Sequence, residues 1–549
     1  MLLRPLLKPN QTAKKNRTTQ YLAVLFASLS FSAFCQEVDI KATLNTTGYI
    51  YETQIGDDEA KQSESILINP SILGSYASRR LSASLSANHS IVRKNSSSDS
   101  EINSVNNSTG QNYTDLKYTS TLDVLENALS LTLSGAQNYR NISQQQDYFS
   151  DKILASEGLT KTQRNTAQLN FSIPNPVYLG FDLQSNYSKT KTDRSQVSEL
   201  GLDNDNLGVT ARLYQGRNIR SLSFDISAQY NDTSRTNFQN FESTRVQGNL
   251  GIPIYEKVDF LITGSVEEYD TGQSGFIGRP NLDTSSYGAG LRWKPSNARI
   301  LSLTYNQLDE GDNQTNFLGL NLAWAFSPRT ALNFDYGKRF YGDAYSLNFK
   351  HSLKSLRTSI SYSEDITSYS RLGANNGNII GIFVCEFGST ALADCFQPDS
   401  PDYQLQAGEE FRAIGDIDSD ISDEVLFRKS GTVSIGYDKR RVKISIDATY
   451  NRTEYLESNR LSTNQSLRFN FNYALGRKTD ISFASSVSRN QFSELDDPDT
   501  IVTSTINFKR ALAQRLKLNI SARLLDRESD NVERDGSDKR LTVGLSYTF

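Results

Sequence analysis

The most constraining feature of this sequence is a two-residue alternation of apolar and polar side chains that recurs over roughly 500 residues. Its clearest instances are Leu222–Tyr230, Leu318–Phe326, Val442–Tyr450, Leu467–Tyr473 and Leu516–Leu524. Successive side chains of a strand point to opposite faces, so each segment is predicted to be a β-strand with one apolar and one polar face. We expect no helix beyond a turn or two near Asp416 to Val425.

The apolar face of these strands must either pack against a second sheet or contact lipid. Soluble sandwiches are built as domains of about 100 residues joined by linkers, and no linker interrupts this pattern. Instead, short connections such as Ser78-Arg79, Gly216 to Asn218 and Lys439-Arg440 alternate with long polar ones such as Asn95 to Gly110. Short turns on one side and long loops on the other are typical of an outer-membrane barrel.

We therefore predict an all-β protein, a transmembrane antiparallel up-and-down β-barrel of about 24 strands (roughly 22–26) in the cell outer membrane. The strands are expected to run from Val38–Thr53 to Lys539–Phe549. An even number places both ends of the barrel on the short-turn side. Residues 36–549 are predicted to form this single barrel, with no periplasmic domain before the first strand.

Residues 1–35 are typical of a signal peptide. Lys14, Lys15 and Arg17 precede an apolar run from Tyr21 to Phe34, which is too short to span a bilayer. Small residues at Ala33 and Cys35 favour cleavage before Gln36. Cys35 also allows a lipoprotein, but bulky Phe34 in front of it argues against that alternative. The mature protein is predicted to be exported.

The C-terminus alternates without a break and stops at an aromatic residue. Its apolar positions are Leu541, Val543, Leu545, Tyr547 and Phe549. This ending resembles the assembly signal of bacterial outer-membrane proteins, so we expect the barrel-assembly machinery as a partner; a soluble terminal strand is the alternative. Aromatic residues near predicted short turns are expected to form the periplasmic girdle: Tyr178, Tyr255, Trp293, Trp324, Phe326, Tyr473 and Tyr547.

Composition argues against several other functions. The 58 Lys and Arg nearly balance the 62 Asp and Glu, which leaves no basic surface for nucleic acid. Two His residues, His89 and His351, stand without a nucleophile motif, so we predict that the protein is not an enzyme. No zinc spacing, EF-hand loop or phosphate-binding glycine loop is present, and we predict no metal site and no cofactor.

The polar face of the strands is predicted to line the lumen. Its charged members carry both signs: Asp225, Arg292, Asp335, Lys443, Asp447, Arg468, Lys517 and Arg523. A barrel of this size is too wide for side chains to fill, so it either conducts or is plugged. Mixed charge with many hydroxyl and amide groups suits small polar solutes such as sugars better than a selective ion path. A merely solvated wall is the alternative for any single residue.

The segment Arg371 to Ile421 is the longest connection and the best candidate for a gate. It contains an apolar patch, Ile379 to Val384, and two cysteines, Cys385 and Cys395. In an exported protein these cysteines are predicted to form a disulfide, worth about 2–3 kcal/mol in the chain-entropy model. The apolar patch favours folding into the lumen. An exposed loop ordered only by its disulfide is an equal alternative.

Two internal segments, Asp335–Leu347 and Arg357–Thr367, resemble a motif of the outer-membrane proteins associated with the PEP-CTERM sorting system. Val425–Lys429 shows the same resemblance more weakly. Membership would imply a large barrel in the context of exopolysaccharide production or export. Two functions stay open: a pore or gated channel for polysaccharide or small polar solutes, and a structural or docking protein with a plugged lumen and adhesive loops.

Overall fold

The computed structural model describes residues 37–96, 110–141, 152–153, 159–193, 203–235, 240–270, 283–309, 314–339, 341–368, 379–386, 395–396, 409–415, 425–456, 460–492, 497–532 and 534–549. The predicted signal peptide and most of the predicted helical turn near Asp416 lie outside these residues. No helix in the described ranges is long and apolar enough to cross a membrane.

The described chain contains 27 strands in all. The first seventeen are β1 (Glu37–Ile55), β2 (Lys61–Ala77), β3 (Leu81–Ser96), β4 (Gly110–Leu125), β5 (Leu129–Asn141), β6 (Leu159–Ser172), β7 (Leu179–Thr192), β8 (Asn204–Gln215), β9 (Ser223–Arg235), β10 (Phe241–Tyr255), β11 (Val258–Asp270), β12 (Thr284–Ser296), β13 (Arg299–Asp309), β14 (Gln314–Ser327), β15 (Thr330–Arg339), β16 (Gly342–Ser352) and β17 (Leu356–Ser368). The others are β18 (Ile379–Glu386), β19 (Cys395–Phe396), β20 (Glu409–Gly415), β21 (Val425–Lys439), β22 (Val442–Tyr455), β23 (Arg460–Gly476), β24 (Thr479–Gln491), β25 (Asp499–Ala511), β26 (Leu516–Glu528) and β27 (Gly536–Thr548).

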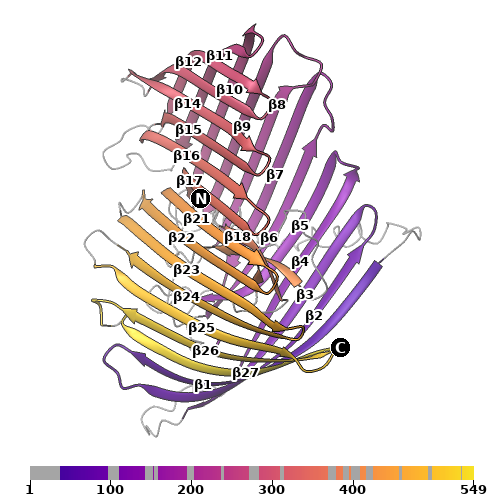
Figure 1. Ribbon diagram of the computed structural model, residues 1–549, viewed down its shortest axis with the longest axis vertical. Coiled ribbons are helices and arrows are strands. Elements are labelled where there is room, and N and C mark those ends of the chain that lie inside the picture. Colours follow the sequence, from indigo (N-terminus) through magenta and orange to yellow (C-terminus); the bar gives the residue numbers. More distant parts are fainter. Residues whose placement is uncertain are drawn as a thin grey trace, which may run out of the picture.

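Twenty-four of these strands form one closed antiparallel sheet, which confirms the predicted barrel. Each strand pairs with the next in sequence, except that β17 pairs directly with β21. The ring closes between β1 and β27, where Ile55 lies opposite Gly536 and Thr43 lies opposite Thr548. Figure 1 shows this closure, with the indigo first strand beside the yellow last one. Closure leaves the paired backbone groups without a free edge, as a membrane requires.

The sequence alternation sorts side chains onto the two faces of this wall. On β13, Leu303 and Tyr305 are 53% and 59% exposed, while the intervening Thr304 is 8% exposed. Leu303 and Tyr305 face outward, and Thr304 faces the concave interior. Directly opposed residues on neighbouring strands share a face, so the strand register shows which residues face inward and which face outward around the ring. The outer wall is apolar and the inner wall polar.

The two ends of the barrel differ in their connections. At one end, called here the turn side, strands join through short links such as residues 256–257 between β10 and β11. At the other, the loop side, most links are longer, and residues 369–424 connect β17 to β21. The predicted gate segment falls in this last link and contains a separate sheet of β18, β19 and β20. The alternation in the sequence did not predict these three strands.

Candidate functional site

The candidate site lies at the loop-side end of the barrel, where side chains from distant strands meet. By register, Phe241 lies on the inner face of β10, whereas Ile366 and Phe427, opposed to each other, lie on the outward side of β17 and β21. Phe241 of β10, Ile366 of β17, Phe427 of β21 and Leu456 after β22 form a buried cluster. Tyr269 and Tyr341 pack against it. We call these six residues the mouth cluster. Six strands, β11 to β16, lie between β10 and β17 along the wall, so the cluster brings remote parts of the ring together.

A group of charged residues lies beside the mouth cluster. The Arg339 guanidinium on β15 donates to Glu267 Oε2 of β11 at 2.9 Å and to the Tyr269 hydroxyl at 2.8 Å. Arg245 of β10 reaches the other oxygen of Glu267 at 3.1 Å. The side chains of Arg339 and Glu267 are only 11% and 5% exposed. A buried carboxylate between two guanidiniums ties β10, β11 and β15 together, because leaving any of these charges without a partner is costly.

Tyr341 joins the charged group to the apolar cluster. It occupies the short link between β15 and β16, and its ring centroid lies 4.4 Å from that of Phe427. The Arg339 guanidinium lies 5.1 Å from the Tyr341 centroid. Burial raises the pKa of the Tyr341 hydroxyl to about 12. Tyr341 therefore stays neutral at any physiological pH.

Glycine permits a close approach of the backbones of β12 and β13. Gly290 of β12 faces inward, since it lies opposite Thr304. A Cβ at Gly290 would lie 2.0 Å from the Leu303 carbonyl oxygen and 2.6 Å from the Thr304 Cα. Both are backbone atoms of β13, which cannot move aside cheaply. The backbones of β12 and β13 therefore lie closer together at Gly290 than a residue with a Cβ would allow.

Elsewhere on the loop side, two described residues of the link between β5 and β6 pack on the inner wall. Ile153, in the link between β5 and β6, is 3% exposed and packs with Tyr51 of β1, Val92 of β3 and Tyr113 of β4. Lys152 beside it forms an ion pair with Asp115 of β4 and donates to Ser90 Oγ at 3.3 Å. The described part of this loop is therefore anchored on the inner wall.

The eight charged residues predicted to line the lumen all lie on the inward-facing side of their strands. The register supports this directly: Asp447 lies opposite Arg468, and Arg523 lies opposite inward-facing Arg540. Asp225 pairs with Arg212, and the Arg292 guanidinium bonds Asp259 at 2.6 Å and also reaches Ser223. The other three are Asp335, Lys443 and Lys517. The structure distributes the eight around the ring rather than in one place.

The structure also places the C-terminal apolar residues, the predicted girdle aromatics, the two cysteines and the two histidines. Leu541, Val543, Leu545, Tyr547 and Phe549 are 39–65% exposed, and the first four lie on the outward face of β27. Among the girdle aromatics, Tyr178 and Tyr255 are 67% and 76% exposed at the turn side. Backbone register places Cys385 of β18 opposite Cys395 of β19. His89 and His351 each approach a threonine hydroxyl at 2.8 Å, on Thr114 and Thr330 respectively.

An apolar outer surface around a closed, polar-lined ring of 24 strands can be stable only in a membrane, and single-chain barrels of this kind belong to bacterial outer membranes. The protein is an outer-membrane β-barrel. No protein-family model matches the sequence, and no curated protein matches it.

Solved structures with a similar strand arrangement include the siderophore receptor PirA from Acinetobacter baumannii, at 10% identity and a TM-score of 0.42 over 92% of this chain and 80% of that one. The FrpB iron transporter (F5-1 variant) from Neisseria meningitidis matches at 8% identity and a TM-score of 0.43, over 92% of this chain and 82% of that one.

The mouth cluster was not predicted from the sequence. Its sequence signal is a set of aromatic residues at the loop-side ends of strands: Phe241, Tyr269, Tyr341 and Phe427. Aromatic residues at that level also suit a second membrane girdle. The pattern alone does not show that they pack on one another.

Proposed function

We propose that this protein is a gated channel for polar, uncharged solutes, with saccharides as the main class. The proposal rests on how burial changes along the inner wall. Arg212 and Asp225, toward the turn side, are 52% and 40% exposed, whereas Arg339 and Glu267 at the mouth are 11% and 5% exposed. A solvated space that ends in a packed constriction is the arrangement of a channel with a gate.

The chemistry of the wall favours neutral solutes over ions. Charges of both signs alternate with hydroxyl and amide groups, and no ring of one sign is present among the described inner residues. Such a wall offers hydrogen bonds in every direction without a strong field. The resemblance of Asp335–Leu347 and Arg357–Thr367 to the PEP-CTERM-associated proteins supports exopolysaccharide as the physiological context.

The segment 371–421 is proposed as a second part of the gate. Its strands β18 and β20 pair with each other, and β19 sets Cys385 opposite Cys395, which supports a disulfide between them. A small cross-linked sheet is rigid enough to obstruct a passage, and its proposed place is within the lumen.

Single-channel conductance in planar bilayers tests the proposal. Replacing Phe241 and Ile366 by alanine removes buried apolar contacts between distant strands, so the double variant should conduct at least twice as well as the wild type. Liposomes containing it should swell faster in a neutral trisaccharide. Leu303→Ala with Leu318→Ala, on the lipid-facing side, should leave conductance unchanged. If neither the mouth variant nor a variant lacking residues 371–421 shows measurable conductance, the channel proposal fails.

The alternative function is a structural or docking protein with a plugged lumen. It is favoured by the anchoring of Lys152 and Ile153 on the inner wall, which shows that an outer loop covers part of the interior. If the mouth variant and the variant lacking residues 371–421 both fold but do not conduct, the structural or docking function is favoured. Heat-modifiable electrophoretic mobility establishes folding of each variant.

A further inference from the structure

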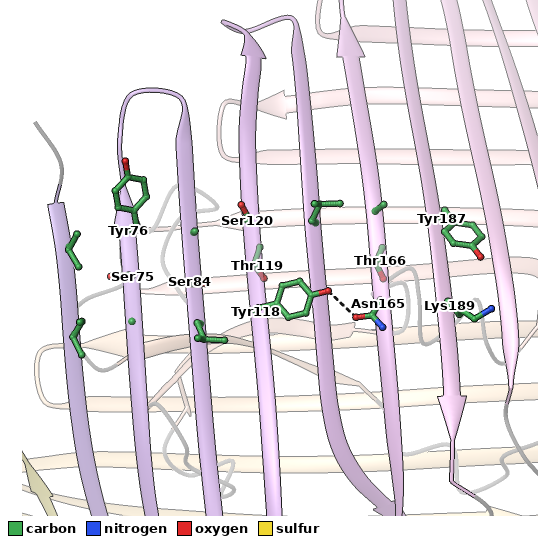
Figure 2. A pocket seen from close by; sticks show the side chains of 17 residues that line it. Ser75, Tyr76, Ser84, Tyr118, Thr119, Ser120, Asn165, Thr166, Tyr187 and Lys189 are labelled. Atoms are coloured by element: carbon green, nitrogen blue, oxygen red, sulfur yellow. Dashed lines mark hydrogen bonds between the residues drawn. The ribbon is translucent and has the colours of Figure 1, made fainter. Parts of the chain in front are cut away.

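The outer wall of β1 to β7 carries a groove that the channel proposal does not use. It encloses about 790 Å³ and is lined mainly by outward-facing residues (Figure 2). The rim includes Ile40 at 66% exposure, Leu85 at 54% and Tyr187 at 45%. These residues face away from the lumen, so in the membrane the groove opens onto lipid.

Two parallel rows of opposed residues form the groove. One row runs from Val38 through Tyr76, Ala83, Ser120, Leu133 and Ala167 to Tyr187. The other runs from Ile40 through Gly74, Leu85, Tyr118, Gly135 and Asn165 to Lys189. Small residues on adjacent strands lower the floor, and the larger ones form its sides.

The groove crosses the membrane obliquely. On β1 it begins at Val38, one residue from the turn-side end of the strand, and on β7 it ends at Lys189, three residues from the loop-side end. Six steps between strands, at about 4.8 Å each and with strands tilted by roughly 40°, give a rise of about 20 Å. The part from β7 to β3 matches one leaflet, which is about half of the roughly 30 Å hydrocarbon core.

Tyr76 and Ser120 also line the groove, but its amide and ammonium groups, on Asn165 and Lys189, lie toward the loop-side end. Tyr118 lies across Gly135 and donates its hydroxyl hydrogen to Asn165 Oδ1 at 2.9 Å, as Figure 2 shows. A Cβ at Gly135 would lie 2.3 Å from the Tyr118 ring, so glycine makes room for this contact. Within the described residues, the Asn165 amide nitrogen has no hydrogen-bond acceptor. An unused donor in an apolar groove suits a ligand that carries a carbonyl oxygen.

Basic side chains continue from this end toward the outer surface. Lys189 pairs with Asp205 at 2.7 Å. Lys191 and Lys161 face outward two and four positions farther toward the loop side, in the register of β6 with β7. Neither has an acidic partner within ion-pair distance in the part of the chain that the structure describes. Their positive charge is available to an anionic headgroup at the membrane surface.

We infer that this groove binds a phosphorylated glycolipid of the outer leaflet. An acyl chain lies along the groove from β7 toward β3, its ester or amide carbonyl accepts from Asn165, and a phosphate lies near Lys161 and Lys191. The outer wall presents an apolar groove, then the Asn165 amide donor, then Lys161 and Lys191. A phosphorylated glycolipid presents an acyl chain, then an ester or amide linkage, then a phosphate in the same order. The inference is independent of what passes through the lumen.

Native mass spectrometry of the purified barrel in neutral detergent tests this inference, with bisphosphorylated lipid A as the probe and phosphatidylglycerol in parallel. Ala83→Phe with Ala167→Phe fills the groove and should weaken lipid A binding at least tenfold. Lys161→Gln with Lys191→Gln should weaken it roughly 30-fold, because each lysine at an anionic surface is worth about a fivefold change.

Matched controls lie on the far wall: Ala448→Phe on β22, and Arg452→Gln with Arg489→Gln at its loop-side end. Each should change lipid A binding less than twofold. Unchanged binding in the filled variant would overturn the inference, as would phosphatidylglycerol binding as tightly as lipid A. A wild-type dimer that the filled variant converts to monomers would instead assign the groove to a second copy of the chain and overturn it too.

Discussion

The two ends of the inner wall carry the same kinds of side chain in the same alternation, but they pack differently. Toward the turn side, the inward pairs Arg212–Asp225 and Lys443–Asp438 are 39–52% exposed. Toward the loop side, Arg527 and Asp499 are 0% and 2% exposed. Polarity therefore places a side chain on the inner face, whereas the packing of other side chains around it decides whether water reaches it.

Asp259 is an exception to this difference in exposure between the two ends. It lies at the turn-side end of β11 and is nevertheless buried between Arg292 and Lys294, each 2.6 Å from its Oδ2. Burial there comes from two long basic side chains that cover one carboxylate. At the mouth, by contrast, burial comes from strands that are far apart along the ring. The two kinds of burial should respond differently to mutation.

The largest difference is expected for removal of a buried charge at the mouth. Glu267→Gln should lower the free energy of unfolding by about 3–5 kcal/mol, because Arg339 and Arg245 lose their carboxylate. Asp225→Asn, in the exposed pair, should cost about 0–1 kcal/mol. Urea unfolding from lipid vesicles measures both. Equal effects would contradict the difference between the two ends.

The cysteines should matter less and more locally. Cys385→Ser should abolish the proposed disulfide and remove about 2–3 kcal/mol from the stability of the small sheet, as limited proteolysis under oxidising and reducing conditions would measure. The barrel itself should unfold as before, because none of its strands pairs with β18, β19 or β20. Two thiols that react freely in the oxidised wild type would exclude the disulfide.

A smaller effect is expected where the backbones of β12 and β13 approach closely. Gly290→Ala places a Cβ against the β13 backbone and should lower the free energy of unfolding by about 1–3 kcal/mol. Gly436→Ala on β21 is the control, since a Cβ there meets nothing within 4 Å. A Gly290→Ala variant as stable as the wild type in urea unfolding would contradict this close approach.

The smallest effect concerns the outer loops. A hydrogen bond to Asp497 raises the pKa of the Asp530 carboxyl, which is fully exposed. A raised carboxyl pKa in the folded state means that this contact is favourable below the ordinary pKa and is lost as pH rises through the folded value. Hydrogen exchange in residues 529–532 should therefore quicken with rising pH beyond its intrinsic trend. Asp530→Asn should remove that additional dependence.

Much of the fold was predictable because a barrel is a local pattern repeated. The alternation in segments such as Val442–Tyr450 identified strands, and connection lengths identified the two ends. The predicted strand number and the continuous up-and-down order are confirmed, apart from β18 to β20 within the long connection. These three were missed because Ile379 to Val384 is a short apolar run without polar alternation, which periodicity cannot assign.

The mouth cluster could not be predicted from the sequence, for a different reason. Tyr341 falls within the segment Asp335–Leu347 that carries the family resemblance, yet nothing nearby in the sequence indicates Phe427 as its neighbour. Their contact depends on how the wall between β10 and β21 curves. That curvature sums small twists over many strand pairs.

The sequence by itself determined the class of structure, the approximate number of barrel strands and the face on which their side chains lie, because a period of two and the turn positions are properties of short segments. The tertiary structure alone decided which inward residues are buried, where distant strands meet, and where the outer wall is hollowed. Those features depend on the shape of the closed ring, and that shape is fixed only when all 24 strands are paired.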